Sequence, residues 1–209
     1  MPTSTFFNLN DSKRAKLLQA AEKEFARAPL PQASIANIVK LAGVSRGSFY
    51  QYFNGKEDAF YYLLKIHTDK RRAYFLKLLQ EKDGDLMASM DQVFRTMLIE
   101  LSEEEHLQFL KNAVLNVTHE IEDSFTELFL GKQPEVDAVN QVKDLVDFKK
   151  LNIDNKQEFF HVMQILTSVT FRNIVDQLSR NLSHEKAIEN FRIEMDLLSK
   201  GLSKVKKQV

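Results

Sequence analysis

Hydrophobic residues recur along this chain every three or four positions, which is the repeat of one face of an α-helix. No segment alternates strictly between apolar and polar side chains, and only 6 Gly and 4 Pro interrupt the helical pattern. The pattern therefore predicts an all-α fold with about nine helices. The expected helices span residues 12–28, 35–41, 46–52, 56–81, 86–101, 107–117, 119–130, 158–178 and 183–205, with a weaker candidate over 134–150.

Two of the expected helices, at residues 35–41 and 46–52, are short and lie close together in the sequence. Gly43, between them, can adopt a positive φ without the steric cost that other residues bear, and a tight turn requires such a residue. Ser34 and Ser45 precede the two helices, where a hydroxyl can accept hydrogen bonds from unpaired amides. This arrangement predicts a helix-turn-helix, in which two short helices are joined by a turn of three or four residues.

The apolar residues of this segment indicate how the two helices face the core. Phe49 and Phe53 are four positions apart, so they lie on one face of the second helix and are expected to anchor it. From the first helix, the residues expected to point inward are Ile38, Val39, Leu41 and Ala42.

The remaining residues of the second helix suit contact with DNA. Arg46 can bind guanine with two hydrogen bonds, and Gln51 can do the same with adenine. Gly47 leaves room for a phosphate to approach the helix, and the flanking tyrosines can stack or donate to phosphate. A solvated helix face is the plain alternative. The expected DNA contacts are Ser34, Ser45, Arg46, Gly47, Ser48, Tyr50, Gln51, Tyr52 and Lys56.

This block closely resembles the signature of the tetracycline-repressor (TetR) family of bacterial regulators. The resemblance is carried by Ile38-Val39, by Ala42-Gly43-Val44-Ser45-Arg46-Gly47-Ser48-Phe49-Tyr50-Gln51-Tyr52-Phe53 and by Lys56-Glu57. The departures are local, with Ala28-Pro29-Leu30-Pro31 in place of a Gly-containing segment, Ser34 for Thr, and Val39 for Ala. The resemblance implies a homodimer that places one recognition helix per subunit in successive major grooves, with an inducer pocket in the C-terminal domain.

The charge distribution agrees with this division of labour. The net charge is +0, but residues 1–56 carry eight Lys/Arg and three Asp/Glu, which leaves +5 there and −5 in the remainder. A basic segment joined to an acidic one is typical of a polyanion-binding module fused to another domain, although chance variation gives the same pattern. We expect a DNA-binding domain at residues 1–55 and a regulatory and dimerisation domain at residues 56–209.

The expected regulatory domain offers candidate residues for two surfaces. Its aromatic and methionine side chains suit a pocket for a hydrophobic ligand. The pocket candidates are Met90, Phe94, Met97, Phe109, Phe125, Phe129 and Arg172. The last helix has a heptad-like apolar seam, which predicts pairing with a second copy in a four-helix bundle. The dimer candidates are Met163, Leu166, Thr170, Ile188, Phe191, Met195, Leu198 and Leu202.

Arg172 has two readings. One is a polar network at the dimer interface, with Asp176 four residues along as a partner of Arg172. Arg172 could instead orient a ligand in the pocket.

Other classes of chemistry find little support. The chain has no Cys, so disulfides and thiolate sites are excluded, and its five His show no metal-ligand spacing. We find no phosphate-binding loop, nucleophile elbow or paired carboxylates against a nucleophile, so we expect neither an enzyme nor a cofactor. There is no signal peptide and no apolar run of about 20 residues, which predicts a cytoplasmic protein without a membrane partner.

The sequence therefore predicts a transcriptional repressor that binds a pseudo-palindromic operator as a dimer and leaves it when a small hydrophobic molecule binds. Two alternatives stay open. The first is a DNA-binding regulator without a small-molecule inducer, controlled by a partner protein or constitutive. The second is a helical enzyme or acyl-carrier-like binder to which the N-terminal domain is incidental.

Overall fold

A computed structural model describes residues 1–103, 108–115 and 138–202, and throughout these ranges the regular structure is helical, as predicted. The chain forms two compact units. The N-terminal unit comprises residues 1–67 together with helix α7, and the C-terminal unit comprises residues 68–102 and the described residues from 138 onward. The expected helix over 119–130 lies outside the described residues.

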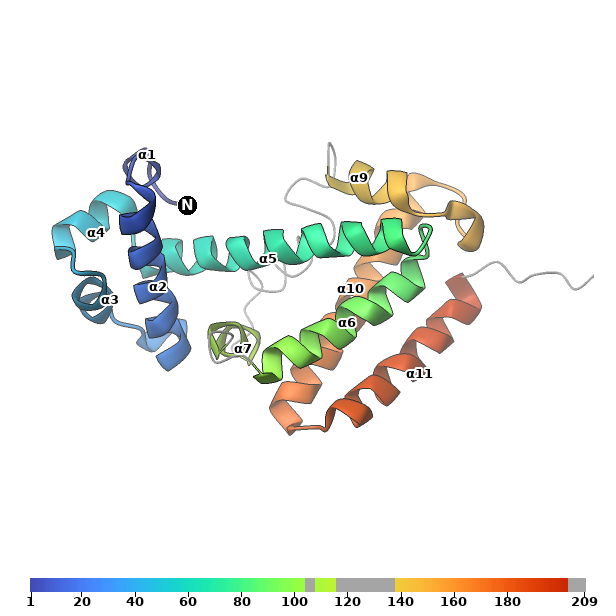
Figure 1. The fold of residues 1–209 in the computed structure, drawn as a ribbon. Coiled ribbons are helices and arrows are strands. Elements are labelled where there is room, and N and C mark those ends of the chain that lie inside the picture. Colours follow the sequence, from blue (N-terminus) through green and yellow to red (C-terminus); the bar gives the residue numbers. More distant parts are fainter. Residues whose placement is uncertain (104–107, 116–137, 203–209) are drawn as a thin grey trace, which may run out of the picture. The chain divides into compact units, whose positions relative to one another are not determined.

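The N-terminal unit contains the short helices of the predicted motif (Figure 1). Its elements are α1 (Ser4–Phe7), α2 (Asp11–Arg27), the 3-10 turn η1 (Leu30–Gln32), α3 (Ile35–Ala42), α4 (Arg46–Tyr52), the first half of α5 (Lys56–Glu81) and α7 (Gln108–Leu115). Asn10 caps the start of α2, because its side chain accepts a hydrogen bond from the Lys13 N–H, and the helix ends before Pro29. The pattern of apolar residues did not predict α1 or η1.

The core of the N-terminal unit is aromatic. Phe25 of α2 lies 5.2 Å, ring centre to ring centre, from Phe60 of α5. Phe60 in turn lies 5.2 Å from Phe109 of α7. All three side chains are buried, and both pairs meet edge to face, the geometry that aromatic quadrupoles favour. Because Phe60 and Phe109 complete this core, the unit extends past the domain boundary expected at residue 55.

The C-terminal unit is built from the longer helices. They are the second half of α5, α6 (Leu86–Glu103), α9 (Ala138–Leu145) with the 3-10 turn η3 (Phe148–Lys150), α10 (Lys156–Arg180) and α11 (His184–Leu202). In the region expected as one weak helix over 134–150, the described residues from 138 onward form α9 and η3. Helices α10 and α11 pack against each other, and Phe191 of α11 stacks on Phe94 of α6 with ring centres 4.0 Å apart.

The turn between α5 and α6 depends on a glycine. Gly84 has φ +70, and its N–H donates to the Leu79 carbonyl while its own carbonyl accepts from the Asp147 N–H. A Cβ at this position would lie 2.5 Å from both the Asp147 nitrogen and the Leu145 oxygen. The backbone after α9 therefore packs directly on this turn.

Replacing this glycine should destabilise the protein strongly. We expect Gly84→Ala to lower the free energy of unfolding by more than about 2 kcal/mol, because a positive φ and a backbone clash act together. Urea unfolding of the full chain measures the change. Gly201→Ala is the matched control, since a Cβ there meets nothing within 4 Å and alanine favours a helix. Equal stability of the two variants would contradict the assigned role of Gly84.

Candidate nucleic-acid interface

Helices α3 and α4 form the predicted helix-turn-helix (Figure 1). Gly43 ends α3 in the left-handed conformation, with φ 69 and ψ 34, as expected for the turn. The Val44 N–H donates to the Val39 carbonyl across this turn, 3.1 Å away. Ser45 then caps α4, because its hydroxyl oxygen accepts the Ser48 N–H at 3.0 Å. These local bonds fix the direction in which α4 leaves the turn.

Helix α4 is anchored from one side only. Phe49 and Phe53 are fully buried, and their rings lie 5.4 Å apart, which confirms that both belong to the core. Within α4 itself, four residues are exposed to solvent, namely Arg46, Gly47, Tyr50 and Gln51. Tyr52 and Ser48 are half-buried, and the Ser48 hydroxyl lies 2.9 Å from that of Ser45.

The exposed face of α4 carries groups that suit a duplex. The Arg46 Nη2 donates to the Tyr50 hydroxyl at 3.3 Å, and the guanidinium lies 5.8 Å from the centre of the tyrosine ring. Both side chains therefore lie together, with Tyr50 45% exposed. At Gly47 an added Cβ would meet only the Ser45 hydroxyl oxygen, at 3.8 Å, so the interior of the protein does not require glycine there.

Two expectations about the motif, for Leu41 and for the Ser34 cap, need correction. Leu41 is 52% exposed instead of pointing inward, because α3 buries only the side that holds Ile38 and Ala42. The Ser34 hydroxyl makes no cap bond to α3, and the Ser34 N–H donates instead to the Glu24 carboxylate at 2.8 Å. Lys56 donates to the carbonyls of Pro31 and Ala33 at 2.8 and 3.0 Å, and its contact with DNA stays a prediction.

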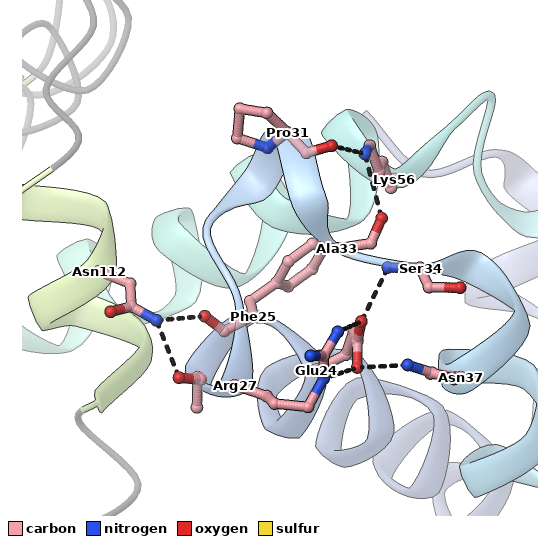
Figure 2. A network of polar contacts seen from close by, with 10 residues as sticks. Glu24, Phe25, Arg27, Pro31, Ala33, Ser34, Asn37, Lys56 and Asn112 are labelled. Carbon is pink, nitrogen blue, oxygen red and sulfur yellow. Dashed lines mark hydrogen bonds and ion pairs between the residues drawn. The ribbon is translucent and has the colours of Figure 1, made fainter.

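Glu24 is the hub of the contacts that hold α3 (Figure 2). Its side chain is 2% exposed and accepts four hydrogen bonds, two from Arg27, one from the Ser34 N–H and one from the Asn37 amide. The hydrogen bonds from Arg27 are the largest cause of a pKa of about 2 for Glu24, and those from Ser34 and Asn37 also lower it. The charged carboxylate therefore joins the end of α2 to the start of α3.

Figure 2 also shows a contact that α7 makes with α2. The Asn112 side-chain amide donates to the carbonyls of Phe25 and Ala26 at 3.0 and 2.8 Å. These carbonyls belong to the last turn of α2, where the helix has no backbone donors left to offer. Asn112 therefore caps α2 although it follows Phe25 and Ala26 in the sequence by 87 and 86 positions.

Neither Glu24 nor Asn112 was among the predicted site residues. A signal for Glu24 exists, since it falls on the same helical stripe as Leu17, Ala21 and Phe25. A charge on an apolar stripe indicates a buried, paired group. No comparable signal marks Asn112, because its partners are backbone carbonyls distant in sequence.

The predicted pocket residues do not all lie in the same unit. Met90, Phe94 and Met97 are buried in the C-terminal unit, whereas Phe109 belongs to the core of the N-terminal unit. Arg172 is 74% exposed, with its Nε 3.7 Å from the Asp176 carboxylate, so it does not point into the interior of its unit. Phe125 and Phe129 lie outside the described residues.

Most of the predicted dimer residues face the subunit's own core. Phe191 stacks on Phe94, and the other buried members of the set are Met163, Leu166, Thr170 and Met195. Three of these five residues lie on α10 and two on α11, all buried within their own subunit, and their part in a dimer interface stays a prediction. Ile188 and Leu198 are half-buried, and the side chain of Leu202 lies outside the described part of the chain.

Among the described residues, no group of three or more His, Asp or Glu side chains is placed to hold a metal ion. Helices long and apolar enough to span a bilayer are likewise absent from that part of the chain. His67, one of the five histidines, has its Nε2 3.0 Å from a carboxylate oxygen of Glu22.

A short helix held from inside, preceded by a glycine turn and presenting Arg46, Tyr50 and Gln51 outward, defines the class of helix-turn-helix DNA-binding proteins. Residues 17–61 match the family model described as bacterial regulatory proteins, tetR family. Residues 85–202 match the model described as tetracyclin repressor-like, C-terminal domain. The chain belongs to the TetR family and is a DNA-binding transcriptional regulator.

Two relatives agree with this assignment. The chain is 30% identical over 150 residues to the HTH-type transcriptional regulator YdgC of Bacillus subtilis, covering 71% of this chain and 68% of that protein. It is also 30% identical over 91 residues to the regulator TtgR of Pseudomonas putida, covering 42% of this chain and 43% of TtgR. The second alignment thus spans less than half of either protein.

Two solved structures share the fold. One is NemR of Escherichia coli in its reduced form, with a TM-score of 0.57 and 18% identity, covering 94% of this chain and 100% of that chain. The other is FadR of Bacillus subtilis in complex with stearoyl-CoA, with a TM-score of 0.54 and 16% identity, covering 90% and 98%.

The contacts of Glu24 should make the stability of the protein depend on pH. Glu24→Gln replaces one acceptor oxygen by a donor, so we expect a loss of about 2 kcal/mol in the free energy of unfolding at pH 7. The pKa of Glu24 is about 2 when folded, against an ordinary 4.5. Its contribution is therefore complete above pH 4.5 and fades as the pH falls towards 2.

Urea unfolding of both proteins between pH 3 and pH 7 measures this difference. The gap between wild type and Glu24→Gln should shrink at the acid end. Glu57→Gln, which alters an exposed carboxylate, should change stability by less than about 0.5 kcal/mol. A gap that stayed constant across the range would show that the charge of Glu24 is not what stabilises the motif.

Proposed function

We propose that this chain is a repressor that binds a pseudo-palindromic operator as a dimer and is released by a small hydrophobic ligand. The observation that carries the proposal is the geometry of α4, with Phe49 and Phe53 buried while Arg46, Tyr50 and Gln51 are exposed on the other side. In a dimer, two such helices would meet successive major grooves about 34–36 Å apart.

The proposed DNA contacts have distinct tasks. Arg46 reads guanine and Gln51 reads adenine, whereas Tyr50 and Tyr52 contact phosphate or stack. Gly47 lets the backbone of α4 approach a phosphate closely, and Ser34, Ser45 and Ser48 contribute hydroxyls. Because Lys56 is engaged with two carbonyls, we place it among the residues that support α3 and not among the base-reading residues.

Selection of bound duplexes from a random pool tests the DNA-binding part of the proposal. The wild type should enrich a two-fold related motif. Arg46→Ala should then cost about 1–3 kcal/mol in affinity and relax discrimination at one position of each half-site. Lys149→Ala, which removes an exposed cation from η3, is the control and should leave affinity unchanged. Uniform binding of all duplexes by the wild type would contradict sequence-specific regulation.

The dimer surface that we propose differs from the predicted seam. Ile193 and Leu197 on α11 are 52% and 62% exposed, and Ile165 on α10 is also exposed. Exposed apolar side chains on helices that already bury their inner faces are typical of an interaction surface. We therefore propose that the outer faces of α10 and α11 pair with a second copy about a two-fold axis.

Ile193→Asp tests this surface, because a charge at an apolar interface is costly unless it is paired. We expect the variant to sediment as a monomer and to lose at least about tenfold in operator affinity, since both half-sites must then be bound separately. Ile99→Asp on α6 is the matched control, with an isoleucine of similar exposure. If both variants were monomeric, or if neither were, the outer faces of α10 and α11 would not be the dimer interface.

The proposed ligand site lies in the C-terminal unit. Met90, Phe94 and Met97 are buried there, so a ligand that reached them would meet apolar and polarisable surface. The similarly folded FadR of Bacillus subtilis was solved with stearoyl-CoA, which supports a ligand with an apolar chain.

Two helices connect ligand binding to DNA reading in this proposal. Helix α5 runs through both units, and we propose that it moves when ligand binds. Helix α7 is covered by the C-terminal family model, yet Asn112 and Phe109 fasten it inside the N-terminal unit. A ligand can shift DNA affinity only as far as it binds one arrangement of these helices better than the other.

Release assays test the ligand part. A panel of metabolites and acyl compounds is screened by thermal shift, and any compound that stabilises the protein is added to the protein–operator complex. We expect release in the wild type and weaker release in Asn112→Ala, with ligand affinity unchanged because Asn112 lies outside the C-terminal unit. Absence of any stabilising compound would favour a regulator that answers to a partner protein or acts constitutively.

A further inference from the structure

A short segment at the start of the chain reaches the end of the recognition helix. Thr3 is the N-cap residue of α1, where a threonine hydroxyl ordinarily accepts a hydrogen bond from its own helix. It makes no such bond here. Instead the Thr3 hydroxyl donates to the Gln51 carbonyl at 2.6 Å, and the Thr3 N–H donates to the Tyr52 carbonyl at 2.9 Å.

These two acceptors are the final carbonyls of α4. The last carbonyls of any helix have no intrahelical donor, and α4 has only 7 residues, so its terminal turn is a large part of it. Helix ends fray when nothing holds them. By binding both carbonyls, Thr3 fixes the turn that carries Gln51 and Tyr52.

The segment is itself held firmly. Phe6 is fully buried, with its ring centre 5.0 Å from that of Phe53 and 5.2 Å from that of Tyr62. The Arg14 guanidinium donates to the Phe7 carbonyl at 3.2 Å. Thr3 therefore belongs to a short segment that is anchored by contacts with α4, α5 and α2.

We propose that Thr3 is a positioning residue for DNA recognition, which sets the C-terminal turn of α4 and thereby aims Gln51. The inference rests on the proposed function. Pairing of a glutamine with adenine needs two hydrogen bonds in fixed geometry, so a small tilt of this turn loses discrimination. Arg46 lies at the other end of α4, where Ser45 supplies the cap, and its contacts do not depend on Thr3.

The test compares discrimination position by position. Single base pairs of the operator selected with the wild type are first substituted one at a time. Binding of these duplexes by Gln51→Ala and by Arg46→Ala, compared with the wild type, identifies the positions that each side chain reads. We expect Thr3→Val to lower discrimination about three- to tenfold at the Gln51 positions, the effect of one hydrogen bond, and less than about twofold at the Arg46 positions. The salt dependence of binding should not change, because the substitution removes no Lys or Arg contact to phosphate.

Two further variants complete the design. Thr3→Ser keeps the hydroxyl and should restore wild-type discrimination. Thr5→Val makes the same chemical change at an exposed threonine of α1 and should have no effect.

Three results would overturn the proposal. One is wild-type discrimination in Thr3→Val. Another is an equal fall at every operator position and in non-specific binding, together with a lower thermal unfolding midpoint, because that pattern marks a merely structural role. The third is failure of the wild type to select any duplex, which would overturn the proposed function as well and is thereby distinguished from failure of the role of Thr3 alone.

Discussion

A helix of seven residues is not stable by itself in water, because nucleation costs more than so few hydrogen bonds return. Helix α4 must nevertheless leave one face uncovered if it is to enter a DNA groove. Its order therefore comes from contacts on the opposite side and at its two ends. Phe49 and Phe53 hold the inner face, and Ser45 holds the beginning. The remainder of the N-terminal unit can be understood as the support for this one short element.

Part of that support is electrostatic. A buried carboxylate is costly unless each of its oxygens is paired, and Glu24 meets this condition with donors from Arg27, Ser34 and Asn37. The result is a directional connection between α2 and α3 that apolar packing alone would not give. Lys56 and Asn112 act in a similar way, since each places side-chain donors on carbonyls near the η1 connection. The orientation of the helix-turn-helix thus depends on several polar contacts from distant parts of the chain.

The C-terminal unit shows a different use of apolar residues. Helix α11 buries Phe191 and Met195 against its own subunit, and it also exposes Ile193 and Leu197. The apolar residues on the second face of this helix are not buried by the fold of its own subunit. In the dimer that we propose, this second surface meets the partner copy, and the inner core remains available for the proposed ligand.

The sequence alone predicted the all-α class, the bounds of most helices and the turn at Gly43, with Ser45 as a cap and Phe49 and Phe53 as anchors. These features arise from interactions among residues a few positions apart, and such interactions are visible in the order of the residues. Only the tertiary structure showed that Glu24 joins α2 to α3, that Lys56 binds carbonyls, and that the seam of α11 faces inward. Each of those facts depends on which distant segment lies alongside, and local periodicity identifies an apolar face without identifying the surface that covers it.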